Sequence, residues 1–187
     1  MIEVSPKKVD SVKYIIITCS GGSGHLQAAA SKKNEIKQLE PEIQEIPQYD
    51  LLLEWAPLGH LGVDLNNLYA KRGEVKKLDK LAKLQTVAEA LYSSSVYVHL
   101  VKILKNSDIE HIINTQPLNI KSICKAAHHV NRLNRKEIEK GIKKPIRITV
   151  VMTDLPSIYA THFFTSLKDL SPKYKNLITL ETTEPAL

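Results

Sequence analysis

Short apolar runs alternate with longer amphipathic segments along most of the chain. The runs are rich in β-branched residues and predict strands at 14–18, 43–49, 109–115, 146–153 and 177–180. Apolar positions spaced three and four residues apart predict helices at 24–39, 65–84, 87–104 and 118–135. Residues 51–62 are apolar but interrupted by proline and glycine, which indicates a loop or short helix packed beside a strand end.

This order of elements predicts an α/β fold, in which helices flank a Rossmann-like, doubly wound sheet of mostly parallel strands. The length of 187 residues corresponds to about one domain. We therefore expect a single domain over residues 1–187, with residues 1–11 as a loosely ordered polar lead-in.

Three predicted loops follow strands immediately, at 21–25, 114–117 and 153–156. Ligands of doubly wound sheets bind beyond the carboxyl ends of the strands, so we expect these loops to gather into one site. The first loop is rich in glycine and leads into a helix whose free N–H groups favour an anion. It matches neither the dinucleotide fingerprint nor the P-loop, which argues against NAD and ATP.

His25 lies where the glycine loop meets the following helix and is the leading catalytic candidate. An imidazole can take up or release a proton near neutral pH, whereas the rest of this loop offers mainly backbone. The alternative interpretation is a tight turn in which His25 only caps the helix.

The composition, with 43% hydrophobic and 25% charged residues, is that of an ordinary globular protein. The sequence has no apolar run of membrane-spanning length and no signal-peptide pattern near Met1, so a cytoplasmic protein is expected. Cys19 and Cys124 lack metal-site spacing and are predicted to be small buried residues. No metal site, disulfide or cofactor is predicted.

Positive charge is concentrated between Lys121 and Arg147. This segment holds nine Lys/Arg against Glu137 and Glu139, nine minus two or +7, while the whole chain carries +6. Such a patch predicts contact with a polyanion such as an anionic membrane surface, and a merely solvated helix is the alternative. Because the segment contains no aromatic residue for stacking, nucleic acid is disfavoured.

Four motifs support a resemblance to a known family. They are Ser20–His25 followed by Ala28-Ala29, the segment from Asp50 to Trp55, Thr115–Leu118, and Val150–Leu155 with Thr161 and Phe163. In these motifs the chain resembles the N-terminal domain of GT-B glycosyltransferases of the monogalactosyldiacylglycerol synthase group, and more distantly the MurG-type transferases. The resemblance implies a Rossmann-like domain that holds a lipid or lipid-linked acceptor, while a second such domain holds the UDP-sugar.

The resemblance also implies roles for particular residues. His25 would act as general base or orienter for the acceptor hydroxyl, and Asp154 would position His25 or cap the following turn. The acceptor would be held by residues of all the motifs, namely Gly21, Gly22, Ser23, Gly24, Trp55, Gln116, Pro117, Thr153, Thr161 and His162.

The donor-binding domain that a GT-B enzyme needs is absent from these 187 residues. The chain is therefore expected to be the amino-terminal part of a longer enzyme, or a half that works with a separate donor-binding subunit, and to transfer no sugar alone. The alternative hypothesis is a degenerate fold that binds an anionic membrane surface or a protein partner. The basic segment favours this alternative, as do Gln116 and His162, which replace residues usual in the family.

Overall fold

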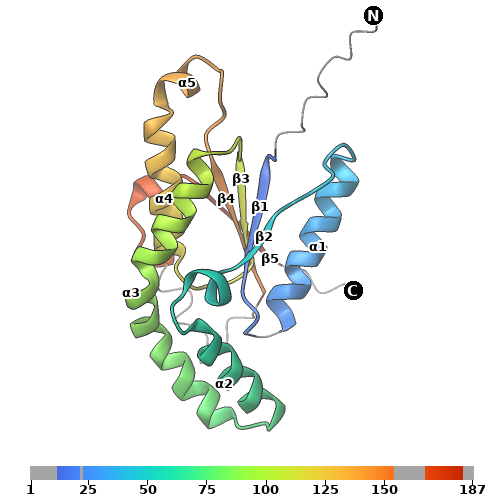
Figure 1. Ribbon diagram of the computed structural model, residues 1–187, viewed down its shortest axis with the longest axis vertical. Coiled ribbons are helices and arrows are strands. Elements are labelled where there is room, and N and C mark those ends of the chain that lie inside the picture. Colours follow the sequence, from blue (N-terminus) through green and yellow to red (C-terminus); the bar gives the residue numbers. More distant parts are fainter. Residues whose placement is uncertain (1–11, 22, 154–166, 183–187) are drawn as a thin grey trace, which may run out of the picture.

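The computed structural model describes residues 12–21, 23–153 and 167–182. The described residues form an α/β fold (Figure 1), as the sequence predicts. Its elements are β1 (Tyr14–Thr18), α1 (Ser23–Leu39), β2 (Gln48–Asp50), the single-turn π-helix η1 (Leu51–Trp55), α2 (Gly59–Lys71), α3 (Val75–Lys105), β3 (His111–Asn114), α4 (Ile120–Leu133), α5 (Arg135–Glu139), β4 (Arg147–Met152), α7 (Pro172–Lys175) and β5 (Ile178–Thr182).

All five described strands are parallel and lie in the order β2-β1-β3-β4-β5. The chain first adds β2 on one side of β1 and then crosses to add β3 on the other side. The direction of winding thus changes between β1 and β3, and in doubly wound sheets ligands bind at such a point. This places the most accessible part of the carboxyl edge at the ends of β1 and β3.

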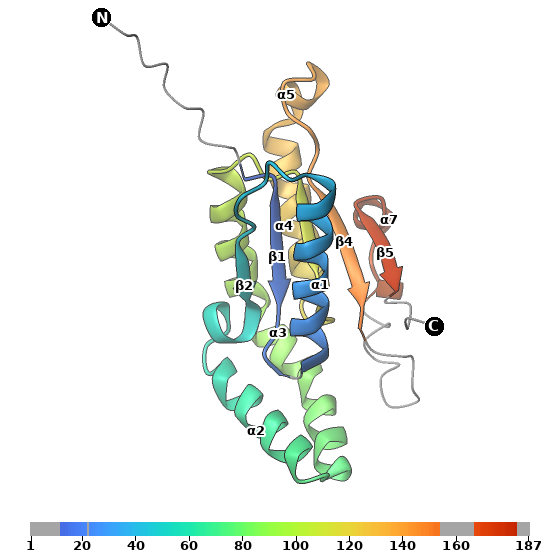
Figure 2. The same cartoon turned by 90° about the vertical axis from the view of Figure 1, so that its right-hand side faces the viewer.

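Helices cover both faces of the sheet (Figures 1 and 2): α1 lies on one side, and α3 and α4 lie on the other. The side chains of β1 alternate between these faces, as a strand requires. Ile15 and Ile17 join a large apolar cluster with Leu100 and Ile123, which we call the main core. Ile16 joins a smaller cluster with residues of α1, which we call the minor core.

The helix boundaries predicted at 65–84 and 87–104 are wrong. Instead α2 begins at Gly59, and α3 runs without interruption for 31 residues from Val75. The break falls at Gly73, whose φ of 65° is left-handed and ends a helix easily. Residues 85–86 are polar but not helix-breaking, so they lie inside α3.

The region before α2 also differs in detail from its prediction. Strand β2 is shorter than expected, because pairing with β1 begins only at Gln48. Ile46 precedes the strand yet is 1% exposed in the minor core. The expected loop at 51–62 contains η1, whose first turn is capped by Asp50, followed by the start of α2.

No helix among the described residues is long and apolar enough to cross a membrane. Both cysteines are buried free thiols, as predicted. Burial raises the pKa of Cys19 and of Cys124 to about 12, which keeps both thiols protonated at neutral pH.

Candidate functional site

His25 is held at the carboxyl edge of the sheet by residues from two neighbouring strands. Its Nδ1 lies 2.8 Å from Oγ1 of Thr153, which follows β4. The hydroxyl of Thr115, which follows β3, donates to the backbone oxygen of His25 at 3.0 Å. The described parts of the three predicted loops therefore meet at one place.

The hydrogen bond between Thr153 and Nδ1 has a chemical consequence for the imidazole. With Nδ1 engaged, the ring is fixed in orientation, and Nε2 has no partner among the described residues. The residue is half-buried. Such a histidine can exchange a proton with a group that approaches Nε2.

The other flank of the glycine loop is tied to β2 and α2. The Ser20 hydroxyl hydrogen-bonds Asp50, and Asn67 of α2 donates to the Ser20 carbonyl at 3.4 Å. Asp50 in turn accepts from the backbone N–H groups of Leu52 and Leu53, each at 3.0 Å. Hydrogen bonds thus hold Ser20 and His25, the residues on either side of the glycines.

Gly21 and Gly24 differ in the space that the fold leaves for a side chain. A Cβ on Gly21 would lie 3.3 Å from the Cys19 sulfur, so the fold itself leaves little room there. A Cβ on Gly24 would meet no protein atom within 4 Å. Ser23 and Gly24 are exposed at the first turn of α1, where free N–H groups point toward the edge. The fold therefore does not require glycine at position 24.

The side chains of two predicted acceptor residues are buried. Trp55 is 4% exposed and packs in the main core against Tyr49 and His99. Gln116 is 1% exposed, and its side chain bonds Asn114 and both backbone groups of Leu118. In this structure the Gln116 side chain shapes the loop after β3 from within.

The remaining predicted positions divide into two groups. Pro117 is half-buried in the loop after β3, beside the edge. Gly22, Asp154, Thr161 and His162 lie outside the described residues. Thr153, predicted as an acceptor contact, forms a hydrogen bond with His25.

A carboxylate that was not predicted from the sequence supports the loop after β3. Glu89 of α3 accepts a hydrogen bond of 2.9 Å from the backbone N–H of Asn119. Asn119 has a left-handed φ of 58° and precedes α4. Burial raises the pKa of Glu89, while the bond from Asn119 partly opposes that shift. Glu89 occupies an ordinary helical position, so no local pattern in the sequence distinguishes it.

The described residues contain no group of His, Cys, Asp and Glu side chains that could hold a metal ion. A scan against protein-family models found no match for the chain, and neither a curated protein nor a solved structure matches it significantly.

Proposed function

We propose that this chain is the acceptor-binding N-terminal domain of a GT-B glycosyltransferase that transfers a sugar from a UDP-sugar to a lipid or lipid-linked acceptor. The observation that carries the proposal is the position of His25. It lies on a glycine-rich loop at the point where the winding of the sheet changes direction, and Thr153 orients its ring. The resemblance in sequence motifs supports the same assignment.

In this proposal His25 takes the proton from the acceptor hydroxyl. Thr153 occupies Nδ1, so the acceptor oxygen would approach Nε2. Thr115 holds the backbone of the same residue, which limits movement of the ring during proton transfer. The exposed first turn of α1 lets polar groups of the acceptor reach backbone N–H donors.

The UDP-sugar would be bound by a different domain or by a separate subunit. The glycine loop lacks both common nucleotide fingerprints. The 187-residue chain should therefore bind an acceptor but neither bind UDP tightly nor transfer sugar alone.

The test is an NMR titration of the imidazole of His25 in the full chain. A short-chain diacylglycerol in neutral detergent micelles should shift the His25 ring resonances saturably, whereas UDP should leave them unchanged. Saturable UDP binding at His25, or no response to the diacylglycerol, would contradict the proposal.

Two glycine variants serve as a matched pair in this titration. Gly24→Ala adds a methyl group that meets no protein atom within 4 Å, as does Gly62→Ala on α2. Only Gly24→Ala should weaken acceptor binding, because its methyl group occupies space on the ligand side of the loop. Equal binding by both variants would place the acceptor elsewhere.

A second candidate function is that of a binding module for an anionic membrane surface. It is favoured by the basic segment Lys121–Arg147, in which Lys121 and Lys125 of α4 are exposed. Vesicle co-sedimentation that depends on lipid charge and on salt, without any response of His25 to diacylglycerol, would favour this function over the first.

A further inference from the structure

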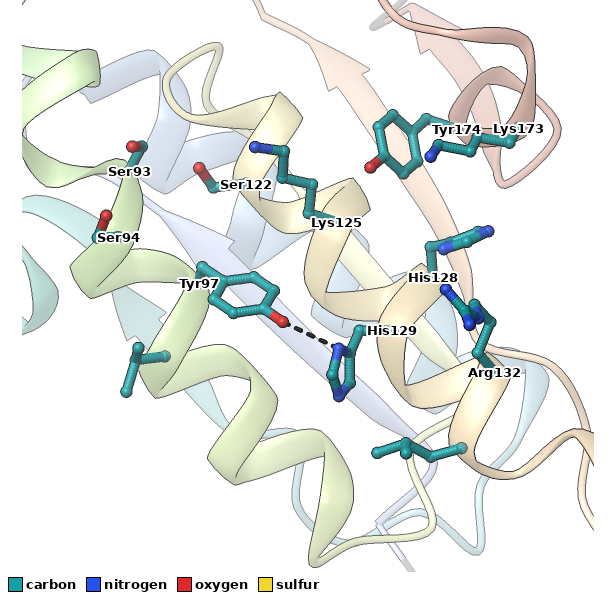
Figure 3. Close-up of a pocket in the computed structure, with 12 residues that line it drawn as sticks. Ser93, Ser94, Tyr97, Ser122, Lys125, His128, His129, Arg132, Lys173 and Tyr174 are labelled. Carbon is teal, nitrogen blue, oxygen red and sulfur yellow. Dashed lines mark hydrogen bonds between the residues drawn. The ribbon is translucent and has the colours of Figure 1, made fainter.

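A pocket of about 690 Å³ lies between α3, α4 and α7, on the main-core side of the molecule. None of its lining residues belongs to the carboxyl-edge site. Figure 3 shows the polar side chains that surround it, among them Tyr97, Lys125, His128, His129, Arg132 and Lys173.

The lining of this pocket is strongly biased toward positive charge. Lys125, Arg132 and Lys173 are cationic at neutral pH, and His128 and His129 can become so. Among the described residues, no aspartate or glutamate lines the pocket. Lys125, His128, His129 and Arg132 follow one another along one face of α4, and Lys173 of α7 adds a cation from a second element.

The pocket cations are not paired with carboxylates of the described residues. None of Lys125, Arg132 and Lys173 forms an ion pair with a described residue. Lys173 instead lies over the ring of Tyr174, 5.0 Å from its centroid. Elsewhere in the basic segment, Arg135 pairs with Glu139, Lys143 with Glu137 and Lys144 with Glu110.

Several neutral polar groups of the pocket are already held in place. The Tyr97 hydroxyl lies 2.9 Å from Nδ1 of His129, which joins α3 to α4. The ring of His128 packs edge-on against Tyr174, with centroids 5.6 Å apart. Ser122 is 4% exposed, lines the pocket, and its hydroxyl has no partner among the described residues. A ligand would therefore meet donors that are largely preorganised.

The positive charges in the pocket act on one another. Burial lowers the pKa of His128, and the nearby charges of Lys173, Arg132 and His129 lower it further. An anion placed among these groups would relieve the repulsion and favour protonation of the histidine.

We propose that this pocket binds a phosphate monoester. A doubly charged phosphate can accept from the planar guanidinium of Arg132 and from the ammonium groups of Lys125 and Lys173 together. The volume exceeds that of a phosphate group, so an attached organic group would occupy the rest, beside the exposed apolar side chains of Val98 and Leu133. This inference is independent of the function proposed for the carboxyl edge.

The test compares a soluble and a lipid-borne phosphate monoester on the full chain. Calorimetry with glycerol 3-phosphate measures the soluble form, and co-sedimentation with phosphatidylcholine vesicles containing phosphatidic acid measures the lipid form. Saturable binding of glycerol 3-phosphate would assign a soluble ligand, and binding of the vesicles alone would assign a lipid headgroup. Either result supports the proposal if it depends on the pocket.

A charge-matched pair of double variants tests that dependence. Lys125→Gln with Arg132→Gln removes two pocket cations, and each lost charge-assisted hydrogen bond should weaken binding about tenfold. Lys136→Gln with Lys140→Gln removes the same charge from exposed positions outside the pocket. This control should weaken binding less than about threefold, because it changes only the long-range attraction, which salt screens. All four side chains are exposed, so circular dichroism should show unchanged folding.

Three results would overturn the proposal. The first is that neither probe binds, and the second is that the two double variants lose affinity equally. The third is that vesicles of equal surface charge made with phosphatidylglycerol, a phosphodiester, bind as well as phosphatidic acid. Each would leave only a general electrostatic attraction to the basic segment.

Discussion

The two faces of the sheet are built differently. The main core combines residues of the strands, η1, α3 and α4, including Trp55, Leu100 and Ile123. On the minor face, α1 contributes only Ala28, Ala29 and Ile36 to the buried cluster of described residues. Most of the apolar burial, and hence most of the stabilisation, lies on the α3–α4 side.

The thin packing of α1 fits its position next to the candidate site. Ala28 and Ala29 are small, so the beginning of α1 can approach β1 and β3 closely. His25, one turn earlier, then reaches Thr115 and Thr153. One face of the sheet thus supplies stability, while the other supplies close positioning of a polar loop.

The largest effect should come from truncating the main core. Leu100→Ala removes a side chain that is fully buried and should cost about 4 kcal/mol of unfolding free energy. Ile36→Ala removes a comparable volume from the minor core at a position 7% exposed and should cost about 2 kcal/mol. Urea unfolding of both variants measures the difference. Equal losses would show that the two clusters behave energetically as one.

A smaller loss is expected where α2 docks onto η1, at the margin of the main core. A Cβ on Gly59 would lie 2.0 Å from the backbone oxygen of Leu52, so Gly59→Ala must displace α2 and should cost about 3 kcal/mol. Gly62→Ala, three residues further along, meets nothing within 4 Å and should stabilise the helix by about 0.5 kcal/mol. Thermal unfolding followed by circular dichroism compares them. If Gly59→Ala is as stable as the parent protein, α2 is not tightly docked.

Glu89 should make the main-core side more stable in acid than in base. Its folded pKa is raised by burial above the usual 4.5, so its ionisation disfavours the folded state. The contribution of protonated Glu89 to the free energy of unfolding is fully present below about pH 4.5 and is lost as pH rises through the raised pKa. Glu89→Gln removes this titration but keeps an oxygen that can accept from Asn119. In urea unfolding from pH 4 to pH 7, the free energy of unfolding of the variant should increase relative to that of the parent protein as pH rises.

An exposed carboxylate gives the matching control for this pH series. Glu42→Gln removes the same charge at a solvent-exposed position and should leave the pH dependence unchanged. If Glu42→Gln and Glu89→Gln behave alike, the effect would reflect net charge instead of burial.

The mildest test uses the two cysteines as reporters of the two regions. Cys124 lies in the main core, and Cys19 lies at the end of β1 beside the glycine loop. Both thiols have a pKa of about 12 and should resist iodoacetamide at pH 8 in the native protein. In moderate urea Cys19 should be alkylated before Cys124, because local opening begins in weakly packed regions. Mass spectrometry of the labelled peptides follows the order; simultaneous modification would mean that both regions open only by global unfolding.

Much of the fold could be predicted because its signals are local. The apolar runs that became β1, β3 and β4 are buried on both faces, so their composition alone distinguishes them from helices. The division between α2 and α3 was placed wrongly. The amphipathic pattern continues across it, and the left-handed turn at Gly73 is one conformation among several that glycine allows.

The candidate site, like the fold, could be predicted from the sequence only in part. The meeting of His25 with the loops after β3 and β4 follows from parallel strand order, so the sequence by itself determined that these segments share one edge. Only the tertiary structure decided which side chains face that edge. Trp55 packs inward against His99, which is distant in sequence, and Gln116 is turned inward by hydrogen bonds to Asn114 and Leu118 of its own loop. The pocket between α3, α4 and α7 also exists only in the folded chain, because its walls come from three elements that pack together to exclude water from the main core.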